Sequence, residues 1–141
     1  MEIEIKQVEG LTFVAKGNTN HWVTIDGPKE FFGSEAASRP MELLLISLGS
    51  CTASDVAAIL MKKHVKLSSF EVKVNGERIN EHPKVFTKIH IMYIFYGKNL
   101  MIKVKDLERA IELSQEKYCP VTAMLKKAVD ITYSYQVIDS S

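Results

Sequence analysis

Residues 39–63, with the sequence RPMELLLISLGSCTASDVAAILMKK, decide the fold of this chain. Proline suits the first position of a helix, and an acid such as Glu42 suits the first turn, where free N–H groups and the positive end of the helix dipole meet it. Lysines at the other end complement the negative end of the dipole. The sequence therefore predicts a helix from Pro40 to about Lys63.

The expected helix is apolar on every face. Its apolar residues include Leu43, Leu44, Leu45, Ile46 and Leu48. A helix that is apolar all round has to be covered all round. One small sheet made by a 141-residue chain covers one side well. We therefore expect a second copy of the chain on the other side, in a homodimer.

Strand-like alternation lies on both sides of this helix. Strands are expected around Ile3–Gln7, Leu11–Ala15 and His21–Ile25 before it, and around Phe70–Val74, Val85–Tyr96 and Ile131–Val137 after it. Asn75 and Gly76 form a turn signal that is expected to end the fourth strand. A helix is expected over Asp106–Lys117. After a break at Cys119-Pro120, a short helix is expected to run through Leu125. The predicted order is βββ-α-ββ-αα-β, an α+β fold with two sheets.

Composition indicates a soluble globular protein with one domain over residues 1–141. Hydrophobic residues make up 46% and charged residues 25%, close to the globular average. The formal net charge of +1 gives no general electrostatic reason to bind nucleic acid or an anionic membrane. The alternating, acidic N-terminus does not resemble a signal peptide, and no uncharged apolar stretch approaches eighteen residues. We therefore expect no membrane span and a cytoplasmic location.

The chain has two cysteines, Cys51 and Cys119, too few for a disulfide scaffold and too far apart for a CxxC pair. Cys51 lies among six small residues in the middle of the expected helix. This run favours either close packing around an inert thiol or space beside a reactive one. Cys119 precedes Pro120 at the start of a new helix, where N–H groups and the dipole favour a thiolate. An ordinary helix break has the same sequence.

Arg39 and Glu42 are further candidates for a site. An Arg–Glu pair beside a thiol could stabilise its thiolate, or the two could be a helix-start carboxylate and a solvated arginine. Glu42 and Cys51 are nine residues apart, which is about 13 to 14 Å along a helix and on opposite faces. Glu42 could therefore serve Cys51 only from a second subunit. The four histidines lack the HxxxH and HExxH spacings, so no metal site is expected.

Two separated segments resemble the OsmC/Ohr family. They are residues 39–52, with the Pro-x-Glu-Leu entry to a helix and a cysteine two and a half turns later, and residues 113–121, LSQEKYCPV. The resemblance implies an intertwined homodimer, with two long helices back to back and sheets wrapped around them. It also implies thiol-dependent reduction of hydroperoxides without a cofactor.

The resemblance also implies roles for the site residues. Cys51 would be the nucleophile that forms a sulfenic acid, Cys119 the resolving thiol, and Glu42 the carboxylate that holds an activating arginine. In the family's peroxidases that arginine comes from the N-terminal strands. Here no arginine precedes Arg39, so Arg39 is the expected substitute.

The expected function is reduction of organic hydroperoxides through a Cys51–Cys119 disulfide that an external dithiol reduces. Apolar residues near the cysteines, Leu48, Val56, Tyr118 and Val121, are expected to favour bulky peroxides. The alternative is a non-catalytic dimer on the same scaffold that binds a ligand or senses redox state. An acyl-thioester hydrolase is a weaker third interpretation, because such enzymes also wrap a sheet around a long helix.

Overall fold

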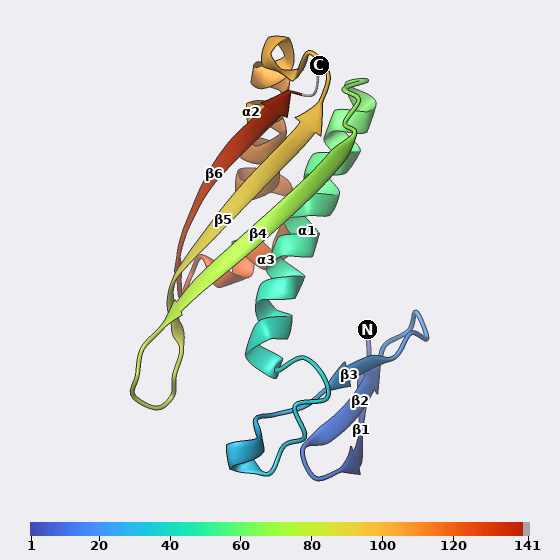
Figure 1. The fold of residues 1–141 in the computed structure, drawn as a ribbon, viewed down its shortest axis with the longest axis vertical. Helices are drawn as coiled ribbons and strands as arrows, with labels where there is room; N and C mark the ends of the chain where they lie inside the picture. The colour runs from blue at the N-terminus through green and yellow to red at the C-terminus, as the bar shows by residue number, and fades with distance from the viewer. Residues whose placement is uncertain (140–141) are drawn as a thin grey trace. The chain divides into compact units, whose positions relative to one another are not determined.

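The computed structural model describes residues 1–139 (Figure 1). The chain divides into two compact units, Met1–Leu44 and Leu45–Ser141. The strands are β1 (Glu4–Glu9), β2 (Thr12–Lys16), β3 (Val23–Ile25), β4 (Ser69–Arg78), β5 (Phe86–Gly97) and β6 (Asp130–Asp139). The helices are α1 (Pro40–Lys62), α2 (Val104–Leu113) and α3 (Pro120–Leu125), with short 3₁₀ turns at Lys29–Phe31 and Leu100–Lys103 and a π turn at Ser114–Tyr118. This confirms the predicted α+β order. A single domain over residues 1–141 stays a prediction.

The first unit is an antiparallel sheet in the order β1-β2-β3. Gly10, with φ of 57°, makes the turn after β1 in a conformation that glycine adopts without strain. β3 starts at Val23, two residues later than predicted. Among the residues of this unit, all of which the structure describes, Asp26 alone is buried. The sheet therefore has no buried apolar core of its own.

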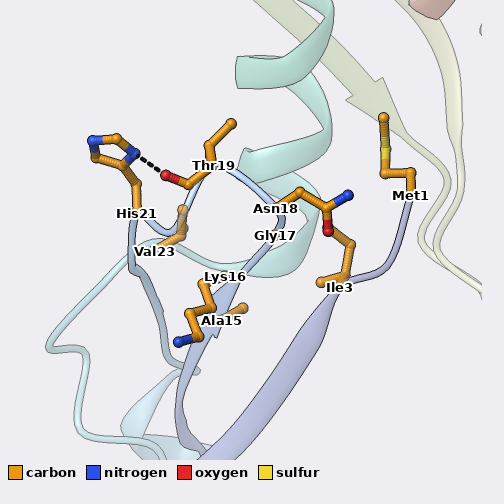
Figure 2. A pocket seen from close by; sticks show the side chains of 9 residues that line it. All are labelled: Met1, Ile3, Ala15, Lys16, Gly17, Asn18, Thr19, His21 and Val23. Carbon is orange, nitrogen blue, oxygen red and sulfur yellow. Dashed lines mark hydrogen bonds between the residues drawn. The ribbon is translucent and has the colours of Figure 1, made fainter.

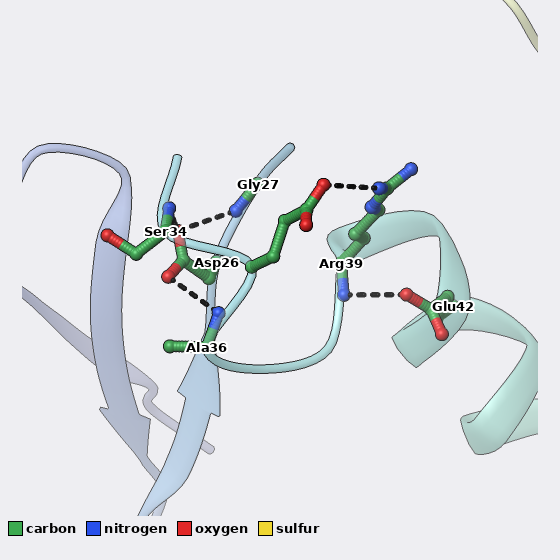
Figure 3. A network of polar contacts seen from close by, with 7 residues as sticks. Asp26, Gly27, Ser34, Ala36, Arg39 and Glu42 are labelled. Carbon is green, nitrogen blue, oxygen red and sulfur yellow. Dashed lines mark hydrogen bonds and ion pairs between the residues drawn. The ribbon is translucent and has the colours of Figure 1, made fainter. Parts of the chain in front are cut away.

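Asp26 organises the loop that leads from β3 toward α1 (Figure 3). Its carboxylate accepts hydrogen bonds from the N–H groups of Gly27 (2.7 Å), Ser34 (3.1 Å) and Ala36 (3.2 Å), and from the Thr12 hydroxyl (2.9 Å). Burial raises the pKa of Asp26, but these four donors favour the charged form more strongly, so the pKa is lowered overall. An ionised Asp26 therefore holds this loop together.

The second unit is a sheet in the order β4-β5-β6, and its helices cover one face of it (Figure 1). β4 and β5 are antiparallel, whereas β5 and β6 are parallel. Parallel neighbours need a crossover connection, which α2 and α3 provide. The predicted alternation of β5 is confirmed in its central part, where Ile89, Ile91, Tyr93 and Phe95 are all buried. These side chains form the centre of the core.

The prediction of a turn at Asn75–Gly76 is wrong. Both residues lie inside β4 and pair with His90 and Ile89 of β5, and the connection follows Arg78 instead. A Cβ atom on Gly76 would lie 2.6 Å from the Phe86 ring, so only glycine fits there. The glycine serves close packing between two strands, which a local turn signal does not distinguish from a turn.

α1 extends from Pro40 to Lys62, as predicted within one residue. Its buried side chains form one stripe at four-residue spacing: Leu48, Thr52, Val56 and Leu60. The stripe faces the sheet, because the Thr52 hydroxyl lies 2.6 Å from the Tyr93 hydroxyl of β5 and hydrogen-bonds to it. In this chain Ile46 is 53% exposed and Met61 is 75% exposed. The helix is therefore buried on one side, and its other side carries uncovered apolar residues.

The prediction that no segment could span a membrane needs correction. By length and composition alone, α1 is long and apolar enough to cross a bilayer. A core helix of a soluble protein passes the same test, and α1 packs its stripe of buried side chains on the sheet. The uncharged stretches on either side of Asp55 were each too short to raise this possibility.

Candidate active site

The two cysteines lie next to each other in the second unit. Cys51 is in the middle of α1 and is partly exposed, whereas Cys119 lies just before α3 and is 2% exposed. The two sulfur atoms and a carboxylate oxygen of Asp55 all lie within 4.8 Å of one another. A disulfide has a sulfur–sulfur distance of about 2.05 Å. The two sulfurs therefore need to approach each other by about 3 Å at most to form a bond.

Cys119 has the place in the fold that the sequence predicted for it. The π turn ends α2, and the N–H of Cys119 donates to the carbonyl oxygen of Ser114 at 2.9 Å. Pro120 then starts α3 at its first position. The Cys119 sulfur accepts a hydrogen bond from the N–H of Thr122 at 3.4 Å. The sulfur is thus held in the position of a helix N-cap, pointing toward Cys51.

The surroundings of Cys51 in this chain favour the neutral thiol. Burial raises the pKa of Cys51, and the neighbouring Cys119 and Asp55 raise it further. A hydrogen bond from the Val121 N–H acts in the opposite direction but does not reverse the shift. The groups around Cys51 in the second unit therefore do not stabilise the expected thiolate. Its activation needs either a positive charge or a proton acceptor.

A chain of buried hydroxyl groups leads from the core to Asp55. Ser114 donates to the Asp55 carboxylate at 2.9 Å, so the Ser114 oxygen is left to accept from Thr52 at 2.7 Å. Thr52 in turn accepts from Tyr93 at 2.6 Å, and Tyr93 accepts from the Gln115 amide at 2.7 Å. Burial raises the pKa of Tyr93, which keeps the phenol neutral and able to donate. In this series of hydrogen bonds, every hydroxyl proton therefore points toward Asp55.

Sequence reasoning did not identify Asp55 or this polar chain. One signal was present, because Asp55 is the single charged residue between Glu42 and Lys62 in an otherwise apolar helix. It also follows Cys51 by four positions, which places both side chains on the same helix face. Asp55 accepts its hydrogen bond from Ser114 of the π turn, and no local pattern indicates this partner.

A pocket of about 450 Å³ adjoins this cluster. Its lining residues are Asp55, Ala58, Ile59, Lys62, Lys63, Leu113 and Tyr118. Most of the wall is apolar. Two lysines also line it, and one of them, Lys63, pairs with Asp106 at 3.1 Å. Tyr118 lines the pocket, in keeping with its predicted place near the substrate. The same prediction is wrong for Leu48 and Val56, which are fully buried in the core against the sheet.

A second pocket, also of about 450 Å³, lies on the first unit (Figure 2). It is lined by residues of β2, β3 and their connection, together with Met1 and Ile3. The titratable side chains there are Lys16 and His21, and the His21 ring contacts the carbonyl oxygen of Thr19 at 2.9 Å. Neither cysteine lines this pocket, so the thiol chemistry of the chain points to the cysteine cluster instead.

Arg39 and Glu42 belong to the first unit (Figure 3). Glu42 accepts a hydrogen bond from the backbone N–H of Arg39 at 3.1 Å, which caps the start of α1. The Arg39 guanidinium pairs with Glu35 at 3.8 Å, and both side chains are about half exposed. Within this chain Glu42 thus holds the backbone of Arg39, and Glu35 pairs with its charge. The roles of Arg39 and Glu42 in catalysis stay predictions.

Assays of the two cysteines need a chelator, because trace metal ions bind thiolates and would block both thiols.

Comparison with known proteins decides the family. A family model described as OsmC-like protein matches residues 33–134. This chain belongs to the OsmC family. The resemblance inferred from the two cysteine motifs is therefore confirmed.

Relatives of this OsmC-family chain match it almost end to end. It is 43% identical over 138 residues to Protein YhfA of Escherichia coli strain K12, covering 98% of each chain. A crystal structure of a protein from Aquifex aeolicus VF5 superimposes with a TM-score of 0.83 at 34% identity, covering 99% of this chain and 97% of that one. An organic hydroperoxide resistance protein OsmC from Legionella pneumophila shares the fold, with a TM-score of 0.66 at 16% identity and coverage of 97% and 98%.

Proposed function

We propose that this OsmC-family protein is a thiol-dependent peroxidase that reduces organic hydroperoxides. One observation carries the proposal: two cysteines 68 positions apart in the chain have their sulfur atoms within 4.8 Å of each other. A nucleophilic thiol beside a second thiol is the arrangement that a two-cysteine peroxidase needs. The name of the Legionella protein, which shares this fold, is in keeping with that chemistry.

The proposed cycle begins at Cys51. Its sulfur attacks the distal oxygen of the hydroperoxide, the O–O bond breaks, and the alcohol leaves with a proton. The resulting sulfenic acid is attacked by Cys119, which forms the disulfide and releases water. An external dithiol then reduces the disulfide by thiol exchange. The cycle uses no cofactor, and it suits the cytoplasm, where free thiols are kept reduced.

The pocket next to the cysteines supports an organic substrate. Its walls are mostly apolar, and Asp55 belongs both to the pocket and to the cysteine cluster. Apolar walls favour an organic hydroperoxide over hydrogen peroxide, because burial of the organic group adds binding energy. We also propose that Arg39, held at the start of α1 by Glu42, brings a positive charge to the cysteines of the partner subunit.

One oxidation experiment tests the cysteine pair. The reduced protein is treated with one equivalent of cumene hydroperoxide per chain in the presence of a chelator, and its mass is measured without reductant. We expect each chain to lose two hydrogen atoms, and peptide mapping to place the bond between Cys51 and Cys119. A free Cys119 beside a sulfenic acid at Cys51, seen as the gain of one oxygen atom per chain, would contradict the two-cysteine cycle. A disulfide without repeated turnover would favour the redox-sensing dimer.

We also propose that the protein is a homodimer. The first unit has no buried apolar side chain, and the large exposed apolar residues there include Ile3, Ile5, Trp22, Val23, Phe31 and Phe32. α1 adds the exposed Ile46 and Met61. Large exposed apolar patches mark protein–protein interaction sites. A second copy of the chain, as the family resemblance implies, would cover these residues.

Light scattering after size exclusion tests the dimer. We expect twice the 15.9 kDa mass of the chain at micromolar concentration. Ile46→Glu is expected to raise the fraction of monomer, because it places a charge on the exposed side of α1. Lys98→Glu, at an exposed position after β5, is the matched control and should leave the dimer intact. A wild-type chain that runs as a monomer would rule out this assembly.

A further inference from the structure

We propose that Asp55 is the acid–base residue of the two-cysteine site: it takes the proton from the Cys51 thiol and delivers it to the oxygen that leaves the peroxide. The role rests on the proposed peroxidase function. It adds a residue that neither the cysteine motifs nor the expected arginine indicates.

The position of Asp55 fits proton transfer with both cysteines. It lies one helical turn after Cys51 on the same face of α1. One of its carboxylate oxygens lies within 4.8 Å of both sulfur atoms, a separation that a small rotation or one bridging water spans. Asp55 also lines the pocket of about 450 Å³. The carboxylate therefore stands between the place where a substrate would enter and the two thiols.

The polar chain holds this carboxylate in place. Ser114 donates to Asp55, and the hydroxyl of Thr52 stands behind Ser114. Because each hydroxyl already donates toward Asp55, none is free to supply a competing proton. Thr52, Ser114 and Tyr93 are thus positioning residues, and Asp55 is the group that accepts a proton.

The state of Cys51 explains why a proton acceptor is needed. Burial, Cys119 and Asp55 raise the pKa of Cys51, so it rests as a thiol. The positive charge proposed for Arg39 would favour the thiolate, but a guanidinium stays protonated and cannot accept the proton. The thiol has to lose its proton to another group as the new bond forms, and a nearby carboxylate can take it.

The proposed steps balance. In the first, the Cys51 S–H bond breaks as the S–O bond forms and the O–O bond breaks; the proton passes through Asp55 to the alkoxide, which leaves as alcohol. Sulfur is oxidised by two electrons and the peroxide is reduced by two. In the second, Cys119 loses its proton to Asp55 as the S–S bond forms and the S–OH bond breaks. The same proton then converts the leaving hydroxide to water.

Asp55→Asn tests this role, because it keeps the size of the side chain and an oxygen that Ser114 can bind. We expect the rate of Cys51 oxidation by cumene hydroperoxide to fall about 100-fold or more. We expect the rate of Cys51 alkylation by iodoacetamide at pH 7 to rise several-fold in the same variant, because the negative charge that opposes the thiolate is gone. A residue that only supports the fold would not move these two rates in opposite directions.

Two further variants complete the experiment. Asp55→Glu keeps a carboxylate and should retain more peroxide reactivity than Asp55→Asn, and it keeps the test valid if the asparagine variant folds poorly. Asp130→Asn makes the same chemical change at the exposed start of β6 and should leave both rates unchanged. All samples contain a chelator.

The outcomes separate the two proposals. If wild-type Cys51 reacts with the peroxide and Asp55→Asn reacts within about threefold of it, Asp55 is not the acid–base residue, although the peroxidase proposal stands. The same conclusion follows if the asparagine and glutamate variants are equally slow. If wild-type Cys51 does not react with the peroxide at all, the peroxidase proposal fails, and the role of Asp55 fails with it.

Discussion

Cys51→Ser is expected to lower the rate of organic hydroperoxide consumption by about a thousandfold or more, because a hydroxyl at that position is a far weaker nucleophile than a thiol. Cys51 is partly exposed and Ser is nearly the same size, so the fold should be unaffected. The loss therefore reports on chemistry. Peroxide consumption with excess dithiol, followed over time at fixed enzyme concentration, measures it.

Cys119→Ser is the informative partner of this variant. A serine at position 119 can still accept the Thr122 N–H as a helix N-cap, so α3 should form normally. We expect one alcohol molecule per chain in a first burst, followed by slow turnover, because the Cys51 sulfenic acid then has no resolving thiol. Equal loss of the first burst in both variants would show that Cys119 takes part before the sulfenic acid forms. Turnover in Cys51→Ser at the wild-type rate would exclude Cys51 as the nucleophile.

Tyr93→Ala is expected to lower the free energy of unfolding by about 3–5 kcal/mol. Tyr93 is fully buried and stacks with Phe70 and Phe95 at centroid distances of 6.5 Å. Removal of the Tyr93 ring leaves a cavity in the core that packs on the sheet. It also removes the hydroxyl that joins Thr52 to Gln115. Since domains are stable by about 5–15 kcal/mol, this variant should be close to unfolded.

Tyr93→Phe separates the two contributions. It keeps the ring and removes only the hydroxyl, and Gln115 still reaches Thr52 at 3.2 Å, so a loss of about 1–2 kcal/mol is expected. Tyr133→Ala is the control, because Tyr133 is 44% exposed on the neighbouring strand and should cost about 1 kcal/mol. Denaturant unfolding of the reduced proteins measures all three. Equal losses for Tyr93→Phe and Tyr93→Ala would mean that the hydroxyl, and not the ring, dominates.

Much of the fold was predictable because neighbouring residues encode it. The proline and acid at the start of α1 and the alternation of Ile89, Ile91, Tyr93 and Phe95 in β5 act over a few positions, and the structure confirms both. The Asn75–Gly76 prediction failed for the opposite reason. Gly76 is required by the Phe86 ring of the next strand, and that contact exists only after the two strands pair.

The site residues also differ in whether local sequence indicates them. Both cysteines, Arg39 and Glu42 could be picked out from residue type, local context and the resemblance to a family. Asp55 could not, because its proposed role depends on the hydrogen bond from Ser114, which lies 59 positions later in the chain. Such pairs depend on how the π turn and β5 pack around α1.

The sequence by itself determined the family, the order of helices and strands, and the identity of the two cysteines. Tertiary structure decided that the cysteines are neighbours, that Asp55 joins them, and that a chain of hydroxyls ends on its carboxylate. The physical reason is the sequence separation over which the interactions act. Helix starts and strand alternation depend on interactions between residues close in sequence. A proton pathway needs groups from distant segments within hydrogen-bonding distance, and only the packed core provides that.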